Sequence, residues 1–239
     1  MAYISIKNVS KTFSDSTTAL KDVSLEIEKR EFTVICGRNG SGKSVLMSLI
    51  AKLDEPSSGT IKVPDSGAGL VFQEADAQIL GETPAEDVAF GLKNQKLPAK
   101  EIESLTEHSL KQVNLWDKRF SSARSLSGGE KRRLAVAGIL AMNRDVIIFD
   151  EPFANLDFPG VQSVCSILKQ LKSEGKTVIL LTHELEKILG LSDRFIILDK
   201  GKIEFNGKPE DGLKLDLEKY GIRNPITKYT STKDLFWGN

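Results

Sequence analysis

Two kinds of hydrophobic pattern mark the strands that this chain is expected to form. Nearly continuous apolar runs, typical of strands buried on both faces of a sheet, fill residues 32–36, 146–149 and 177–182. Alternation of apolar and polar positions, typical of strands with one exposed face, fills residues 2–7 and 23–27. Turn residues bound further short strands at residues 60–63, 69–72, 195–198 and 202–205.

Helical patterns fill much of the remaining chain. Residues 74–125 carry no strong strand signal and predict an inserted helical lobe, in which residues 83–86 have the pattern of a capping box. Another helix is predicted over residues 127–142, and a third from Pro159 to a stop at Gly175. Because strands alternate with helices, we expect an α/β fold with a parallel sheet and helices on both of its faces.

One glycine-rich stretch, Gly37-Arg38-Asn39-Gly40-Ser41-Gly42-Lys43-Ser44, fits the pattern G-x-x-x-x-G-K-[ST] of a phosphate-binding loop. Its glycines allow backbone N–H groups to point at a polyphosphate. Lys43 offers a positive charge to the β- and γ-phosphates, and the Ser44 hydroxyl can ligate Mg²⁺. The alternative is a glycine-rich turn that matches by chance, but an expected strand precedes the stretch and an expected helix follows it. The sequence therefore predicts nucleotide binding.

Polar residues end several other expected strands. Gln73 ends one strand, Asp150 and Glu151 end a second, and His183 ends a third. Ligands of parallel sheets bind at the carboxyl ends of the strands, so these groups are expected to converge beside the phosphate loop. Asp150 could then face Mg²⁺, and Glu151 could orient a water molecule as a general base. Two acids before Pro152 could by themselves simply open a turn, an alternative that the neighbouring phosphate loop disfavours.

The segment Ser127-Gly128-Gly129-Glu130 has two interpretations. As local structure it is a capping box, in which the Ser127 side chain accepts a helix N–H and Glu130 reaches back. As a functional element, its two glycines expose N–H groups at the positive end of a helix dipole, where an anion can bind. The segment alone leaves both interpretations open.

Composition narrows the possible partners. Lys and Arg total 33, as do Asp and Glu, which gives no charge signal for binding nucleic acid or an anionic membrane surface. The two cysteines, Cys36 and Cys165, are expected to be core residues, and with only two histidines no structural zinc site is expected. The chain has no signal-peptide pattern and no apolar run near the ~20 residues that span a bilayer. We therefore expect a soluble cytoplasmic protein that reaches a membrane only through another protein.

Together these motifs resemble the ATP-binding cassette (ABC) family over nearly the whole chain, in order and in approximate spacing. The matching segments are the phosphate loop for Walker A, residues 146–151 for Walker B with its following glutamate, residues 126–130 for the signature, Gln73 for the Q-loop, residues 155–157 for the D-loop and His183 for the switch histidine. The resemblance implies an α/β P-loop NTPase (RecA-like) with a parallel sheet core, an antiparallel β subdomain and an inserted α-helical signature subdomain. It implies one ABC ATPase domain over residues 1–239, with the core in 1–73 and 145–239 and the helical subdomain in 74–144.

The resemblance also implies a head-to-tail dimer, with ATP and Mg²⁺ held between Walker A of one chain and the signature of the other. The residues that it implies for catalysis are Lys43, Gln73, Glu151 and His183, with Ser44, Gln73 and Asp150 at the metal. The residues that it implies for ATP binding are Phe13 and the loop Gly37, Arg38, Asn39, Gly40, Ser41, Gly42, Lys43 and Ser44. The resemblance also implies that each chain contributes residues to the site of its partner. These are Ser127, Gly128, Gly129 and Glu130, with Asp157 in the D-loop. Phe13 stands where the family usually stacks a tyrosine on adenine.

The chain departs from the usual family pattern in a few places. Glu130 replaces the usual glutamine of the signature and brings a carboxylate near a triphosphate. The segment 52–73 is short, which suggests a trimmed antiparallel subdomain. The tail after Gly207 is short as well, which argues against a C-terminal dimerisation domain and leaves Phe236-Trp237 as a possible packing anchor.

Within the family, Asp87-Val88-Ala89-Phe90-Gly91 is similar to the ATPases of energy-coupling factor transporters, which import vitamins, cobalt or nickel. Glu74-Ala75 stands where those ATPases more often have Asn-Pro. The alternative is that Val88 and Phe90 merely pack a helix of the lobe.

The expected function is an ATP-binding and ATP-hydrolysing subunit that powers a membrane transporter, of the energy-coupling factor type for a vitamin or a transition-metal ion. Its expected partners are a second ABC ATPase chain, in a homodimer or a heterodimer, and transmembrane transporter subunits that hold it at the inner face of the cell membrane. The alternatives are the ATPase of another ABC importer class, or a soluble ABC ATPase outside transport. A regulatory cassette without hydrolysis would require degenerate catalytic residues, whereas Glu151 and His183 are intact.

Overall fold

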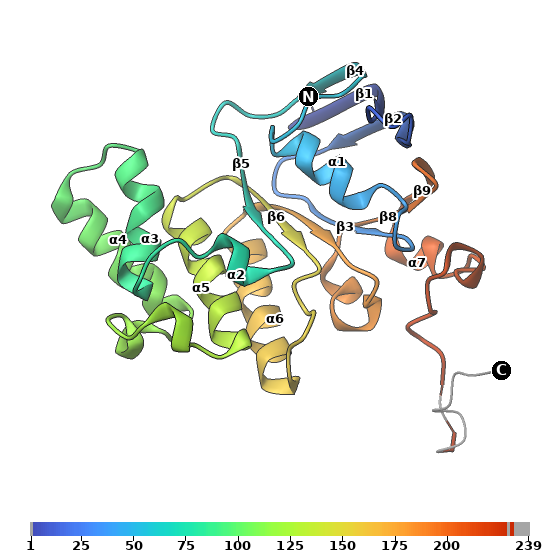
Figure 1. Cartoon of the computed structure of the whole chain (residues 1–239). Coiled ribbons are helices and arrows are strands. Elements are labelled where there is room, and N and C mark those ends of the chain that lie inside the picture. Colours follow the sequence, from blue (N-terminus) through green and yellow to red (C-terminus); the bar gives the residue numbers. More distant parts are fainter. Residues whose placement is uncertain (1, 229, 232–239) are drawn as a thin grey trace.

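A six-stranded sheet forms the centre of the protein. The computed structural model describes residues 2–228, 230 and 231 (Figure 1). The strands of the central sheet lie in the order β5 (Ala68–Val71), β6 (Val146–Asp150), β7 (Thr177–Leu181), β3 (Phe32–Cys36), β8 (Arg194–Asp199) and β9 (Lys202–Gly207). The first five are parallel, and β9 returns antiparallel to β8. Every residue of β3, β6 and β7 is buried, which explains why their sequences are continuously apolar.

A three-stranded antiparallel sheet packs beside the central one, in the order β2 (Thr18–Ile27), β1 (Ile4–Thr12) and β4 (Ser58–Lys62). β1 and β2 are longer than the alternating stretches predict, because irregular pairing interrupts the alternation. At two of the irregular positions, Asn8 and Asp22, φ is 50° and 53°. The Asn8 amide donates to Asp22 Oδ1 at 2.9 Å, so polar side chains bond to each other where the ladder is interrupted.

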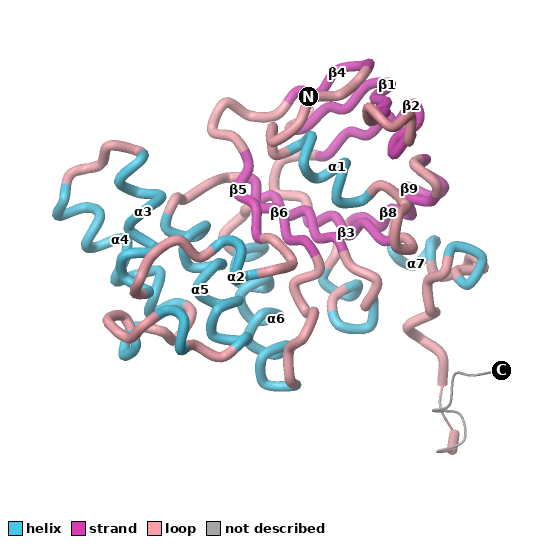
Figure 2. Tube along the Cα trace, viewed as in Figure 1, coloured by secondary structure: helices cyan, strands magenta, loops and turns pink. Residues whose placement is uncertain are grey.

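The helices between β5 and β6 form a lobe at one side of the central sheet (Figures 1 and 2). They are α2 (Ala75–Gln78), α3 (Pro84–Asn94), α4 (Ala99–Gln112), η1 (Trp116–Lys118), η2 (Ala123–Ser125) and α5 (Gly128–Ala141). Val88, Leu92 and Leu110 are fully buried in one cluster with Leu134 of α5, and α5 also contacts β5. α5 therefore connects the lobe to the central sheet. The boundaries of the helical subdomain at residues 74 and 144 stay a prediction.

The capping box predicted at residues 83–86 forms only in part. The Thr83 side chain accepts from the Glu86 N–H at 3.3 Å, as expected at a helix N-terminus. The Glu86 carboxylate, however, accepts from Glu82 N at 3.2 Å rather than from Thr83 N. The Glu86 side chain reaches one residue further back, so the reciprocal arrangement predicted there is wrong.

Two apolar cores cover the two faces of the central sheet. On one face, α1 (Lys43–Ile50) and the antiparallel sheet share a core with Ile148. On the other face, Ile147 and Phe149 join a core with α5 and α6 (Phe158–Ser173). Neighbouring residues of a strand point to opposite faces, so the sheet fills both cores, and each large buried side chain stabilises the fold by roughly 1.5–3 kcal/mol.

After β9 the chain forms α7 (Pro209–Gly212), which packs against β8 and β9. Leu217 and Ile222, further along the chain, are buried. Further short turns are η3 (Leu185–Lys187), η4 (Leu189–Leu191) and η5 (Glu218–Tyr220). Phe236-Trp237, predicted as a packing anchor, lies outside the described residues. None of the helices in the described part of the chain is long and apolar enough to cross a bilayer.

Candidate functional site: a phosphate loop at the carboxyl edge of the sheet

A pocket of about 540 Å³ opens where the parallel strands end. It collects residues that follow β3, β5, β6 and β7, and also part of the connection into β2. The lining residues are Thr17, Thr18, Ala19, Asn39, Gly40, Ser41, Gly42, Lys43, Ser44, Val45, Gln73, Asp150, Glu151 and His183. The convergence that the parallel sheet predicted for the phosphate loop, Gln73, the two acids and His183 is therefore present.

The phosphate loop takes a backbone path that requires glycine. Gly37 has φ 154°, and a Cβ there would lie 2.0 Å from the Leu198 carbonyl oxygen. Gly42 has φ 105° and is the residue before the first turn of α1. Because no side chain caps α1 and its first turn contains no acid, its N–H groups and dipole favour an anion.

Two polar side chains lie within this loop. The buried Lys43 ammonium donates to the carbonyls of Gly37 at 2.7 Å and Arg38 at 3.2 Å. The Ser41 hydroxyl is buried and has no hydrogen-bond partner among the described residues. A positive charge and an unpaired hydroxyl in one glycine-rich cradle fit a polyphosphate, because both can bind its oxygens.

Ser44 and Asp150 form an oxygen pair at the floor of the pocket. The Ser44 hydroxyl donates to Asp150 Oδ2 at 3.2 Å. Burial raises the pKa of the Asp150 carboxyl, and Glu151 adds to the rise, while the Ser44 hydrogen bond and the charges of Lys43 and Arg132 oppose it. A hydroxyl and a carboxylate, with the Gln73 amide in the same pocket, are ligands that suit Mg²⁺, and the metal charge would favour ionised Asp150.

Glu151 and His183 form a second pair across the same edge. Glu151 is buried and holds φ at 45°, a left-handed conformation that costs energy for a non-glycine residue. Its N–H donates to the Leu181 carbonyl at 2.9 Å, which ties this strained residue to β7. Glu151 Oε1 lies 3.0 Å from His183 Nδ1. A carboxylate can only accept, so this contact suits the His183 tautomer with its proton on Nδ1, and it orients the imidazole.

Some predicted ATP-binding residues lie outside the pocket lining. Phe13, 40% exposed, lies between β1 and β2, with Lys11 Nζ 5.5 Å from its ring centre. Gly37 and Arg38 are not among the lining residues. The Arg38 side chain donates to the Lys219 carbonyl at 2.8 Å and pairs with Asp199. Sequence reasoning also missed Thr17, Thr18 and Ala19 in the lining. Their signal is indirect, because Thr17 ends the connection that begins at Phe13, and Thr18 and Ala19 open β2.

The signature segment lies on the lobe, away from this pocket. Ser127 Oγ accepts from Glu130 N at 3.3 Å, and Glu130 Oε2 accepts from Ser127 N at 2.9 Å, so the capping-box interpretation is confirmed. Gly128 has open space where a Cβ would be. Asp157 caps α6 by accepting from Gly160 N at 3.0 Å. The anion-binding role of this segment stays a prediction.

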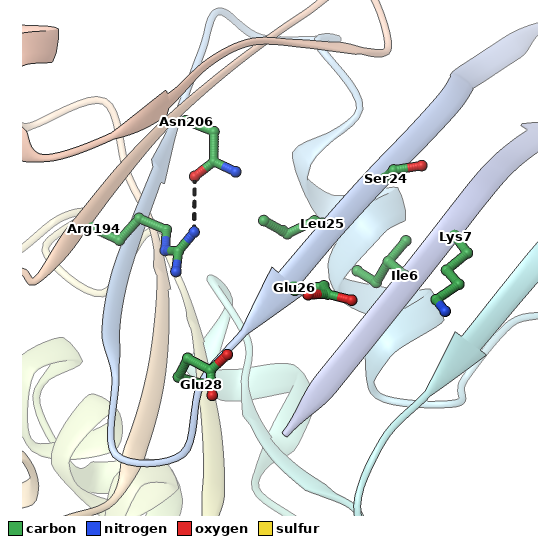
Figure 3. Close-up of a pocket in the computed structure, with 8 residues that line it drawn as sticks. All are labelled: Ile6, Lys7, Ser24, Leu25, Glu26, Glu28, Arg194 and Asn206. Carbon is green, nitrogen blue, oxygen red and sulfur yellow. Dashed lines mark hydrogen bonds between the residues drawn. The ribbon is translucent and has the colours of Figure 1, made fainter. Parts of the chain in front are cut away.

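Another pocket, of about 430 Å³, lies between the two sheets at the opposite edge (Figure 3). Arg194, at the start of β8, donates to Asn206 at 3.2 Å and holds Glu31 with two bonds of 2.6 and 3.0 Å. Its charge is therefore compensated within the protein. This pocket contains none of the residues singled out from the sequence, and we assign it a structural role.

Comparisons with known proteins agree with this geometry. The sequence model of the family described as "ABC transporter" matches residues 20–154. The energy-coupling factor transporter ATP-binding protein EcfA1 of Caldanaerobacter subterraneus subsp. tengcongensis is 41% identical, covering 94% of this chain and 88% of that protein. EcfA1 of Clostridium novyi is also 41% identical, over 87% of this chain and 80% of that protein.

Solved structures give the same result. The cbiO1 of Clostridium perfringens, described as part of the ABC transporter complex cbiONQ, superposes with a TM-score of 0.82 at 31% identity, covering 94% of this chain and 96% of that chain. The ATP-binding cassette MJ0796, in a dimeric post-hydrolysis state bound to ADP and Pi, gives 0.77 at 30% identity, over 86% and 98%.

A phosphate loop between a parallel strand and a helix, with an acid ending the neighbouring strand, defines a P-loop nucleotide-binding protein. The match to the family model and the similarity to the relatives show which family within that class the chain belongs to. The chain belongs to the ABC transporter family, in its ATP-binding branch.

Proposed function

We propose that this protein binds ATP with Mg²⁺ and hydrolyses it as the ATPase subunit of a membrane transporter. The observation that carries the proposal is the single pocket that gathers Lys43, Ser44, Gln73, Asp150, Glu151 and His183. In that pocket a buried carboxylate faces an imidazole, beside a phosphate cradle and a hydroxyl–carboxylate pair.

Each group has a distinct role in this proposal. The phosphate loop and Lys43 bind the β- and γ-phosphates, and Phe13 stacks on adenine from the connection between β1 and β2. Ser44, Asp150 and Gln73 hold Mg²⁺, which would neutralise charge that develops on the phosphate oxygens. Glu151 accepts a proton from the attacking water, and His183 binds the γ-phosphate.

The site is completed by a second chain. Ser127 to Glu130 and Asp157 do not line the pocket of their own chain. As the family resemblance implies, they would face the nucleotide of the partner. The open space at Gly128, in the first turn of α5, supports an anion contact there. The dimeric state described for MJ0796 supports the same arrangement.

The proposed transporter is of the energy-coupling factor type, taking up a vitamin or a transition-metal ion such as cobalt. The names of the relatives support the type, and the cbiO1 neighbour belongs to a described transporter complex. On the lobe, Leu80 is 67% exposed, Phe90 48% and Phe120 73%, so apolar side chains are available there for contact with transmembrane subunits. Those subunits would hold the protein at the inner face of the cell membrane. An ATPase of another ABC importer class is the alternative.

Replacing Glu151 with glutamine tests the proposal. Glu151→Gln keeps the size of the side chain but removes the proton acceptor, so hydrolysis should slow by ~10²–10⁴-fold while ATP still binds. Phosphate release and binding of a fluorescent ATP analogue measure the two effects. Glu184→Gln is the matched control, because Glu184 is paired with Lys187 outside the pocket. Wild-type turnover in Glu151→Gln would remove Glu151 from the proposed role.

A further inference from the structure

Arg132 is a buried cation on the signature helix α5, and nothing in the sequence patterns singled it out. Its side chain leaves the lobe and donates to the carbonyls of Phe72 at 3.0 Å, Gln73 at 2.6 Å and Ala154 at 3.4 Å. Only 4% of the residue is exposed. The guanidinium therefore joins three structural units: helix α5, the segment that follows β5 and the loop that follows β6.

The hydrogen-bond acceptors of Arg132 indicate what its side chain does. A buried guanidinium is costly unless its N–H groups are bonded, and arginine usually pairs with a carboxylate. Here all its hydrogen bonds within the described chain go to backbone carbonyls. Burial lowers the pKa of Arg132, while the charge of Asp150 opposes that change. Such an arrangement fixes main chain in place, because a carbonyl cannot move without leaving the charge unpaired.

Both contacted loops carry groups of the nucleotide pocket. Arg132 holds the carbonyl of Gln73, and the Gln73 side chain lines the pocket. Ala154 donates its N–H to the Glu151 carbonyl at 3.2 Å, so the second loop is bonded back to the proposed base. One cation of the lobe therefore fixes the backbone on two sides of the site.

We infer that Arg132 is a positioning residue that holds the Gln73 segment and the loop after Glu151 in register with the signature helix. The inference rests on the proposed function, because it assigns the two loops to one Mg²⁺–ATP site. Through Arg132, the nucleotide pocket of a chain and the signature segment that the same chain offers to its partner would move together.

The next residue on the same helix provides a control. Arg133 Nε donates to the Val113 carbonyl at 3.0 Å, and both residues belong to the lobe. Arg133→Met therefore removes an arginine–carbonyl bond from α5 without touching either loop. Arg132→Met removes the bonds across the pocket, and Arg132→Lys keeps the charge but loses the planar fork.

The decisive measurement is how strongly Mg²⁺ tightens the binding of a non-hydrolysable ATP analogue. Its dissociation constant is compared in Mg²⁺ and in EDTA for each variant, with thermal unfolding recorded alongside. In Arg132→Met we expect the Mg²⁺ enhancement to fall by about tenfold, as when a group supporting a metal ligand is lost. We expect an intermediate enhancement in Arg132→Lys and the wild-type value in Arg133→Met.

The sign of the effect separates positioning from electrostatics. Removing a positive charge near Asp150 should by itself attract Mg²⁺ more strongly, so a weaker enhancement identifies lost geometry. An unchanged or larger enhancement in Arg132→Met would overturn the inference, as would an equal loss in Arg133→Met. If Arg132→Met does not fold, wild-type enhancement in Arg132→Lys overturns it instead. A wild-type protein without any Mg²⁺ enhancement would refute the proposed function itself.

Discussion

Glu130 shows how a single residue can depart from a family pattern without losing its local role. Its carboxylate accepts from Ser127 N and pairs with Lys118 Nζ at 2.5 Å. The hydrogen bond from Lys118 is the main cause that lowers the pKa of Glu130, with Ser127 second. The negative charge that looked awkward in the sequence is therefore compensated by η1. Sequence reasoning could not find this partner, because Lys118 lies in a separate turn of the lobe.

The compensation predicts a rescue experiment. Lys118→Ala would leave an unpaired carboxylate where the partner's triphosphate is proposed to bind, and like charges repel. We expect ATP-dependent dimerisation to weaken about fivefold or more, since a nearby unit charge in water contributes ~1 kcal/mol. Adding Glu130→Gln should restore it, because the amide can still accept from Ser127 N. Sedimentation at low salt would measure both effects.

Lys111→Ala is the control for this experiment. Lys111 forms a similar exposed ion pair with Glu107 on α4, at 2.6 Å. An equal loss in this variant, or no rescue by Glu130→Gln, would show that Lys118 does not act through the signature charge.

At the scale of elements, the segment Asp87–Gly91 has a structural explanation as well as a family resemblance. Asp87 Oδ1 accepts from Leu80 N at 2.7 Å and Gly81 N at 3.0 Å, which fastens the turn before α3. A Cβ at Gly81 would lie 2.3 Å from Asp87 N, so the turn requires glycine there. Val88 is buried as the packing alternative predicted, whereas Phe90 is 48% exposed. The packing alternative thus holds for Val88 alone.

The Asp87 turn predicts a pH effect on stability. Burial raises the pKa of the Asp87 carboxyl, and its two backbone N–H donors only partly oppose the rise. Folding then favours the protonated form, so this contribution to stability is present below the unfolded pKa and is lost as pH rises through the folded pKa. Asp87→Asn keeps one acceptor oxygen without the charge. Its free energy of unfolding should therefore increase relative to that of the wild type as the pH rises through the folded pKa. Urea unfolding from about pH 4 to about pH 8 would show the difference.

Asp87→Ala is the contrasting variant. It removes both hydrogen bonds and should lower the free energy of unfolding at every pH, by about 1–3 kcal/mol for two bonds. A gap between wild type and Asp87→Asn that does not change with pH would exclude titration of Asp87 as the cause.

At the scale of the whole molecule, the parallel sheet made the site predictable. Gln73, Asp150 and His183 are far apart in sequence, but each lies at the end of a parallel strand or two residues beyond it, and all three line one pocket. What could not be predicted arises from packing between elements. Ala19 reaches the pocket because its carbonyl packs against Gly42, where a Cβ would lie 2.6 Å away. Arg132 and Arg133 are the same residue type at adjacent positions, so the sequence does not distinguish them. Their side chains point in different directions, and Arg132 bonds to the Gln73 carbonyl whereas Arg133 bonds to the Val113 carbonyl.

The same geometry separates two half-sites within one chain. The Lys43 cradle lies at the edge of the sheet, and Ser127 lies on the lobe outside that pocket. If each nucleotide needs one half-site from each of two chains, then two differently damaged chains can complement each other. A Lys43→Ala chain keeps its signature, and a Ser127→Arg chain keeps its cradle, so their mixed dimer retains one intact site.

Mixing the two inactive chains should therefore restore ATP hydrolysis. Random pairing places half of the chains in mixed dimers with one working site of two, so the mixture should reach about a quarter of the wild-type rate. Mixing Lys43→Ala with Asp150→Asn should restore nothing, because both changes damage the same half-site and every dimer lacks an intact one. Activity in the first mixture alone requires a site shared between chains, whereas equal rates in both mixtures would place all catalytic groups within one chain.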